Sequence, residues 1–240
     1  MDVHADTGPY PASLTATLDP GISRWLWLVK WLLAIPHLVV LAPLWFAAGV
    51  LTFYAGLAIL VTGRYPRPLF DFNLGVMRWS WRVAFYAYAA LGTDRYPPFS
   101  LRSDPTYPAD FEVEYPAHLS RGLVLVKWWL LALPQYLVAM VLVGGFGVAL
   151  GNPVHVVTGS GLIGVLVLVA AVALLFTGTY PRPLFDLTIG LDRWCYRVLA
   201  YAALMTDRYP PFRLDSGGAD PWAMGRKTAQ PAEGGDAAAP

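Results

Sequence analysis

Two long stretches of this chain contain no Asp, Glu, Lys or Arg. One lies between Lys30 and Arg64, and the other between Lys127 and Arg182. Each is far longer than the roughly 20 apolar residues that cross the hydrocarbon core of a bilayer. A soluble core would need many polar segments to cover both, yet the chain is 56% hydrophobic and only 14% charged. The sequence therefore predicts an integral membrane protein.

Two heptapeptides occur twice in the same order, so the chain contains two copies of one unit. Tyr-Pro-Arg-Pro-Leu-Phe-Asp occupies 65–71 and 180–186, and Thr-Asp-Arg-Tyr-Pro-Pro-Phe occupies 93–99 and 206–212. The predicted boundaries are a disordered N-terminus at 1–9, membrane repeats at 10–106 and 107–214, and a disordered tail at 215–240 that is rich in Gly, Ala and Pro.

The spacing between the copies shows where they differ. It is 97 to 98 positions as far as Pro134 and 115 positions from Thr177 to Arg197, so the second copy carries 17 additional residues between Pro134 and Thr177. At the second heptapeptide the spacing is 113 positions. Insertions are tolerated in loops rather than inside membrane helices. We therefore expect an outer loop at 151–161, which is rich in turn-forming residues, and an equivalent turn near 47–49 in the first copy.

The predicted fold is an all-α integral membrane protein in which each repeat is a transmembrane helical hairpin followed by an amphipathic third helix. The expected hairpin helices are 22–46 with 50–62, and 119–150 with 162–177. All Lys and Arg residues lie outside the hairpin tips, so the positive-inside rule places the Tyr-Pro-Arg-Pro loops and both termini in the cytoplasm. Lys30 and Lys127 would then extend their side chains to the membrane surface.

The third helix of the first copy, at 72–92, carries Arg78 and Arg82 on one face. An Arg near the bilayer centre costs about 2.5–3.5 kcal/mol. A helix lying in the interface avoids this cost. Its expected lipid-facing side chains are Trp79, Trp81, Phe85 and Tyr86. Four spans are accordingly favoured over an alternative with six spans and inverted copies.

Each copy opens with a segment in which apolar and polar residues alternate, at 14–18 and at 111–115. This alternation predicts short strands on the cytoplasmic side. Because isolated strands are unstable, we expect the two to pair with each other or with the extended segments that follow Phe99 and Phe212.

These motifs, together with Ala-Ile-Pro-His at 34–37, resemble a bacterial membrane protein family called domain of unknown function 4389. The resemblance covers 10–214 as two tandem copies. It implies a bacterial inner-membrane protein and supplies no reaction, substrate or cofactor. The second copy departs from the first at Gln135, which replaces His37, and at Thr179.

The charged residues around the Tyr-Pro-Arg-Pro motifs have two interpretations. In the first interpretation, the arginines together form a candidate site that binds anions or lipid headgroups. They are Arg67, Arg78 and Arg82, with Arg182, Arg193 and Arg197 in the second copy. As a structural device, Asp71 and Asp186 cap the next helix and pair with Arg78 or Arg193. One Asp cannot neutralise three Arg, so both interpretations stay open.

The remaining composition disfavours several functional classes. No nucleophile stands beside a base, and no His cluster has metal-ligand spacing, so we expect no catalytic site, metal or cofactor. A membrane enzyme with a site on the cytoplasmic face is the weakest alternative. A net charge of +1 argues against a nucleic-acid partner. We expect a scaffold or accessory subunit that binds membrane lipids, a protein partner or a second copy, with a small transporter or channel as the alternative.

Overall fold

The structure is a computed structural model that describes residues 10–144 and 161–214. The predicted disordered ends and all but the last residue of the predicted outer loop lie outside these ranges. The described part is mostly helical, with one small sheet. In chain order the elements are β1 (Ala12–Ala16), α1 (Trp27–Thr62), α2 (Arg67–Ala87), β2 (Ala109–Val113), α3 (Arg121–Val126), the π-helix η1 (Lys127–Leu131), α4 (Leu133–Val143), α5 (Leu162–Thr177) and α6 (Arg182–Ala202).

The two predicted strands pair with each other, which confirms one of the expected arrangements, although each lies two residues earlier in the chain than predicted. β1 and β2 are antiparallel, with Leu14 opposite Phe111 at the centre of the register. These two residues are equivalent in the two copies. Ala12 lies opposite Val113, and Val113 is in turn the equivalent of Ala16. The sheet therefore joins the copies through an approximate two-fold relation.

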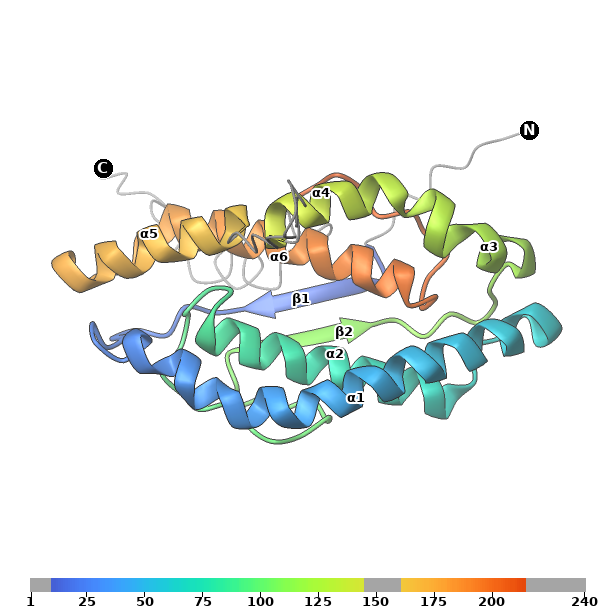
Figure 1. The fold of residues 1–240 in the computed structure, drawn as a ribbon, viewed down its shortest axis with the longest axis horizontal. Coiled ribbons are helices and arrows are strands. Elements are labelled where there is room, and N and C mark those ends of the chain that lie inside the picture. Colours follow the sequence, from blue (N-terminus) through green and yellow to red (C-terminus); the bar gives the residue numbers. More distant parts are fainter. Residues whose placement is uncertain (1–9, 145–160, 215–240) are drawn as a thin grey trace, which may run out of the picture.

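The helices form layers on both sides of this sheet (Figure 1). α2 lies between α1 and β2, and α6 lies between the α4 and α5 helices and β1. Each repeat thus places its opening strand on the amphipathic helix of the other repeat. Two isolated strands would be unstable. This exchange places each of them against the apolar side chains of a helix.

The predicted hairpin in the first copy is wrong, because α1 is one continuous helix of 36 residues. At 1.5 Å per residue it is about 54 Å long. Pro36, Pro43 and Gly49 lie inside it without ending it. It ends at Gly63, whose left-handed φ of 72° is favourable for Gly. The next helix, α2, begins within a Pro-Arg-Pro sequence: Pro66 precedes its first residue, and Pro68 lies in its first turn, where Pro is favourable.

In the second copy the counterpart of α1 is interrupted by the insertion. The chain leaves α4 at Gly144 and returns at Gly161, where an added Cβ would lie 2.2 Å from the backbone nitrogen of Gly144. Figure 1 shows α3, α4 and α5 in succession along one long edge, with α1 along the other. The insertion therefore interrupts a helix, and the two Tyr-Pro-Arg-Pro turns lie at opposite ends of the molecule.

The third helices are interior elements, which corrects their predicted place in the membrane interface. Every residue from Asn73 to Ala87 in α2 is buried. The side chains expected to face lipid pack inside the protein: Trp79, Trp81, Phe85 and Tyr86. Helix α2 contacts α1 and β2, so Arg78 and Arg82 face other parts of the protein and not lipid headgroups.

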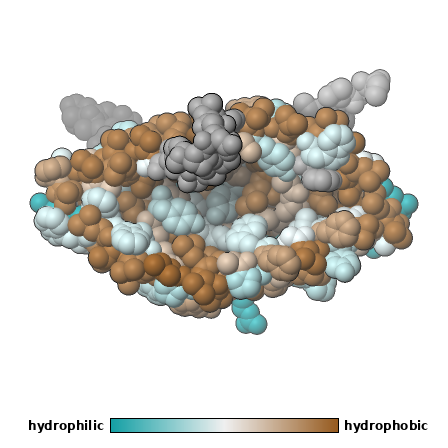
Figure 2. All heavy atoms as spheres, in the orientation of Figure 1, coloured by the Kyte–Doolittle hydropathy of each residue, from teal (hydrophilic) through white to brown (hydrophobic). Residues whose placement is uncertain are grey.

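The outer helices expose apolar side chains along their length. Phe46 on α1 is 77% exposed and Phe176 on α5 is 79% exposed. Figure 2 shows hydrophobic residues along both long edges, with a hollowed and less hydrophobic band between them. Among the described helices, only α1 is long and apolar enough to cross a membrane. Near the N-terminus, these properties fit either a membrane span or a signal sequence.

Candidate functional site

Arg78 is buried at the centre of a polar cluster between α2 and β2. Its Nη2 lies 2.8 Å from Glu112 Oε1, and its Nε lies 3.0 Å from Asp110 Oδ1. The guanidinium also donates to the carbonyl oxygens of Phe111 and Leu101, at 3.0 and 3.3 Å. The predicted pairing with Asp71 is wrong, because β2 supplies the carboxylates.

The second copy repeats this contact with its own arginine. Arg193 Nε donates to the carbonyl oxygen of Leu14 at 3.2 Å, and Leu14 is the equivalent of Phe111. Each arginine thus holds the strand of the other copy. β1 carries Ser13 and Thr15 where β2 has its two carboxylates. The charge cluster around Arg78 is therefore a feature of one half only.

Arg82 and Arg197 also lie inside the protein. Arg82 is fully buried and donates to the carbonyl oxygen of Arg102. Within the described ranges its Nε and Nη1 have no hydrogen-bond partner, and burial lowers the pKa of Arg82 while Asp110 opposes that shift. Arg197 donates to the carbonyl oxygen of Arg213 at 2.9 Å and lies 5.7 Å from the Tyr10 ring. Each arginine therefore attaches its own helix to an extended segment, Arg82 to the segment at Arg102 and Arg197 to the segment at Arg213.

The arginines of the Tyr-Pro-Arg-Pro turns are separate from these buried groups. The Arg67 side chain is 64% exposed, pairs with Asp71 at 3.5 Å and lies over the Tyr115 ring. Asp71 is inside α2, so it does not cap the helix. Arg182 and Asp186 are exposed, and no ion pair joins them in the part of the chain that the structure describes. The structure does not bring three arginines of either copy into one site.

Two buried lysines form a repeated anchor that the sequence reasoning missed. Lys30 is fully buried, with Nζ 2.8 Å from Asp94 Oδ1 and 2.6 Å from the Thr93 carbonyl oxygen. Lys127 is equally buried, with Nζ 2.9 Å from Asp207 and near the Thr206 carbonyl. The predicted extension of both lysines to the membrane surface is wrong. Their shared partners are the Thr-Asp pairs of the second heptapeptide.

His37 is buried inside the protein, and within the described residues its Nε2 has no hydrogen-bond partner. Its Nδ1 accepts a hydrogen bond from Trp79 Nε1 at 3.1 Å, and its ring stacks on Phe99. The equivalent Gln135 is also buried, and its amide donates to the carbonyl oxygen of Pro210 at 3.3 Å. His37 on α1 and Gln135 on α4 each contact the segment of their own copy that contains Thr-Asp-Arg-Tyr-Pro-Pro-Phe.

Asp192 is a buried carboxyl group that sequence reasoning also missed. It is 5% exposed on α6, and within the described residues its Oδ2 has no hydrogen-bond partner. Burial raises the pKa of Asp192 well above its ordinary range. The first copy has Met77 at the equivalent position, so aligning the two copies would have revealed this acid.

The residues of the described ranges contain no group of three or more His, Cys, Asp or Glu side chains that could hold a metal ion.

Comparison with known proteins agrees with the motif resemblance. The family described as Domain of unknown function (DUF4389) matches residues 24–100 and 154–213, which is more than half of the chain. No curated protein and no solved structure matches the chain. The two matched segments contain both heptapeptides of each copy. The chain therefore belongs to the DUF4389 family.

Proposed function

We propose that this protein is a multi-pass protein of the bacterial inner membrane that acts as a scaffold or accessory subunit without catalysing a reaction. It binds lipid headgroups or a protein partner at its cytoplasmic face, where both termini also lie. The observation that carries this proposal is the inverted arrangement of polarity. Apolar side chains cover the outer helices, whereas Lys30, Lys127 and Arg78 are buried and paired with carboxylates.

The size of the apolar surface supports residence in a membrane. Soluble monomers rarely expose continuous apolar patches larger than a few hundred Å². Exposed apolar residues extend on α1 from Trp31 to Val61, and on the opposite edge they include Leu137, Val141 and Val165. A bilayer would cover both edges, because neither is covered by another part of the described protein.

The location of the charged groups supports a binding role. Arg78, Arg82 and Arg197 hold internal segments and are unavailable to a ligand, whereas Arg67 and Arg182 are exposed. Exposed cations near an anionic leaflet contribute about 1 kcal/mol each. We therefore assign headgroup contact to the exposed arginines, each at its own end of the molecule, and we assign the buried ones to the scaffold.

Cysteine labelling of the full-length protein tests its location and orientation. We expect the protein to resist alkaline extraction from membranes. In a Cys195→Ser background, which copies Ser80 of the first repeat, a cysteine at Ser103 should react with an impermeant maleimide in inverted vesicles but not in intact cells. A cysteine at Val154, outside the described residues, should react in intact cells. Release by alkali would contradict membrane residence, and labelling of Ser103 in intact cells would contradict the orientation.

A small transporter or channel is the second candidate, and Asp192 is the observation that favours it. Ionisable groups buried in membrane proteins commonly mark ion or proton pathways. If this function is correct, the purified protein in liposomes should carry a proton or cation current that Asp192→Asn lowers by about tenfold or more. Asp192→Met, which copies Met77, provides a second variant. An absence of current in the wild-type protein would leave the scaffold role as the supported function.

A further inference from the structure

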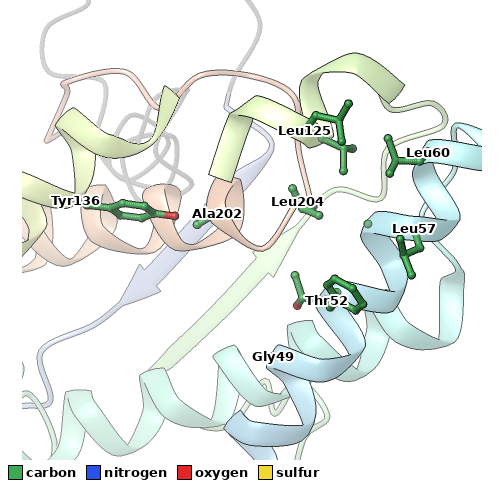
Figure 3. Close-up of a pocket in the computed structure, with 11 residues that line it drawn as sticks. Gly49, Thr52, Leu57, Leu60, Leu125, Tyr136, Ala202 and Leu204 are labelled. Carbon is green, nitrogen blue, oxygen red and sulfur yellow. The ribbon is translucent and has the colours of Figure 1, made fainter. Parts of the chain in front are cut away.

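An apolar groove of about 560 Å³ lies between the two repeats. We call it the α1–α3 groove. Residues of α1, α3, α4 and the end of α6 line it, as Figure 3 shows. The principal lining residues are Gly49, Gly56, Leu60, Val124, Leu125 and Leu204. Its volume is within the range of small-molecule sites, and its lining is almost entirely apolar.

Differences between the copies explain why space remains here. Val124 corresponds to Trp27 in the first copy, and Trp27 packs partly buried against the core. Val124 is smaller than Trp27 and lines the groove. On α1, Gly49 has no atom within 4 Å of the position where a Cβ would lie. The groove is therefore open beside Gly49.

Two arginines lie at one end of the groove. Arg64 lies four residues after the lining residue Leu60, just beyond the end of α1, and Arg121 precedes the lining residue Leu125 by one turn of α3. Their segments meet, because a Cβ on Gly63 would be 3.7 Å from Arg121 Nε. Both are exposed, and neither forms an ion pair with a carboxylate within residues 10–144 and 161–214. An apolar groove with two cations at its end is complementary to an acyl chain attached to a phosphate.

We propose that the α1–α3 groove binds one anionic glycerophospholipid, with an acyl chain along α1 and the phosphate at Arg64 and Arg121. This inference rests on the proposed residence in a membrane. It adds a defined lipid site to the general headgroup contact assigned to Arg67 and Arg182. The lipid would fill the space between the repeats and connect α1 to α3.

The test fills the groove without disturbing the protein. Gly49→Leu places a side chain in open space and replaces Gly with a better helix former, so folding should be preserved. The wild-type protein and the variant are purified in mild detergent after incubation with phosphatidylglycerol, and retained lipid is measured by mass spectrometry. We expect about tenfold less phosphatidylglycerol on the variant, as follows when roughly two methylene groups lose their burial. Val124→Trp, which copies Trp27, should act in the same direction.

Two further variants give the result its specificity. Ala42→Leu, at an exposed position of α1 outside the groove, should retain as much lipid as the wild-type protein. Arg64→Gln with Arg121→Gln should remove the preference for phosphatidylglycerol over phosphatidylcholine.

Three results would overturn the proposal. They are unchanged retention in folded Gly49→Leu, an equal loss in Ala42→Leu, and a change in oligomeric mass without lipid loss, which would assign the groove to a second copy. Failure of the groove variants leaves membrane residence standing, since alkaline extraction tests that separately.

Discussion

Exchanging Asp94 for Asn should lower the apparent melting temperature of the protein in mild detergent by roughly 6–20 °C. Removing one partner of a buried ion pair typically costs about 3–5 kcal/mol, and each kcal/mol corresponds to about 2–4 °C for a chain of this size. Lys30 would lose its carboxylate while its ammonium group remains fully buried. Asn keeps the shape of Asp and can still accept the Ser23 backbone N–H.

Neutralising both partners shows whether the loss of stability comes from the unpaired charge or from altered packing. Replacing a buried pair with uncharged groups of similar volume is often nearly neutral. We therefore expect Lys30→Met with Asp94→Asn to recover most of the lost melting temperature. The second copy provides a repetition of the experiment, because Asp207→Asn should be as damaging as Asp94→Asn and Lys127→Met should rescue it.

The control for this series is Asp71→Asn, which removes an exposed ion pair within one helix. Such pairs contribute about 0.3–0.5 kcal/mol, so the melting temperature should change by only about 1–2 °C. Fluorescence of the ten Trp residues reports unfolding. If Asp94→Asn melts within 2 °C or so of the wild-type protein, the lysine anchor is not a determinant of stability.

The sequence revealed the repeat but not the reason for its second heptapeptide. Lys30 and Asp94 recur together as Lys127 and Asp207, at spacings of 97 and 113 positions. This joint recurrence was a detectable sign of pairing. The expectation that Lys snorkels to the surface came from considering one helix in lipid, and it omitted the neighbouring segment that solvates the ammonium group inside the protein.

The continuous α1 could not be distinguished from a hairpin by composition. Its apolar run exceeds the thickness of one bilayer core, and it contains Pro36, Pro43 and Gly49, so length and turn residues both favoured two helices. The spacing assigns the 17-residue insertion to the interval between Pro134 and Thr177, and α4 and α5 end and begin within this interval at Gly144 and Gly161. The inference from it was wrong because a helix can be interrupted where its two ends still meet, as Gly144 and Gly161 do.

The buried position of α2 could not be predicted without knowing where the two strands lie. From a single helix, Arg78 and Arg82 had to face either lipid or headgroups, and the energy cost favoured headgroups. The alternating residues of β2 were recognised, yet their sequence could not show that β2 would place Asp110 and Glu112 beside Arg78. The exchange of strands between copies is a tertiary feature, and it decides whether these arginines are structural or available to a ligand.

Exchanging Arg78 for Met is expected to destabilise the protein without changing its lipid content. The substitution leaves Asp110, which is 18% exposed, without its cation, and it leaves the Phe111 and Leu101 carbonyl oxygens without this donor. We expect a loss of about 3–5 kcal/mol, or roughly 6–20 °C in melting temperature. Arg78→Lys should give an intermediate value, since an ammonium group cannot reproduce the planar, multiple contact of a guanidinium.

Arg67→Gln is the matched control, because it removes an exposed arginine from the same helix. We expect its melting temperature to change by about 1–2 °C, since its pair with Asp71 is exposed. Retention of anionic lipid should fall when Arg67→Gln is combined with Arg182→Gln. Stability would then depend on Arg78, and lipid binding on Arg67 at the start of the same helix.

A triple variant shows whether the Arg78 cluster acts through its charges. Adding Asp110→Asn and Glu112→Gln to Arg78→Met removes the unpaired carboxylates but leaves the two carbonyl oxygens without a donor. Each unsatisfied buried acceptor costs about 1–3 kcal/mol, so we expect partial recovery of the melting temperature. Full recovery would show that the charges alone matter. A loss of anionic lipid from Arg78→Met at unchanged melting temperature would instead return Arg78 to the headgroup site and contradict its role in holding β2.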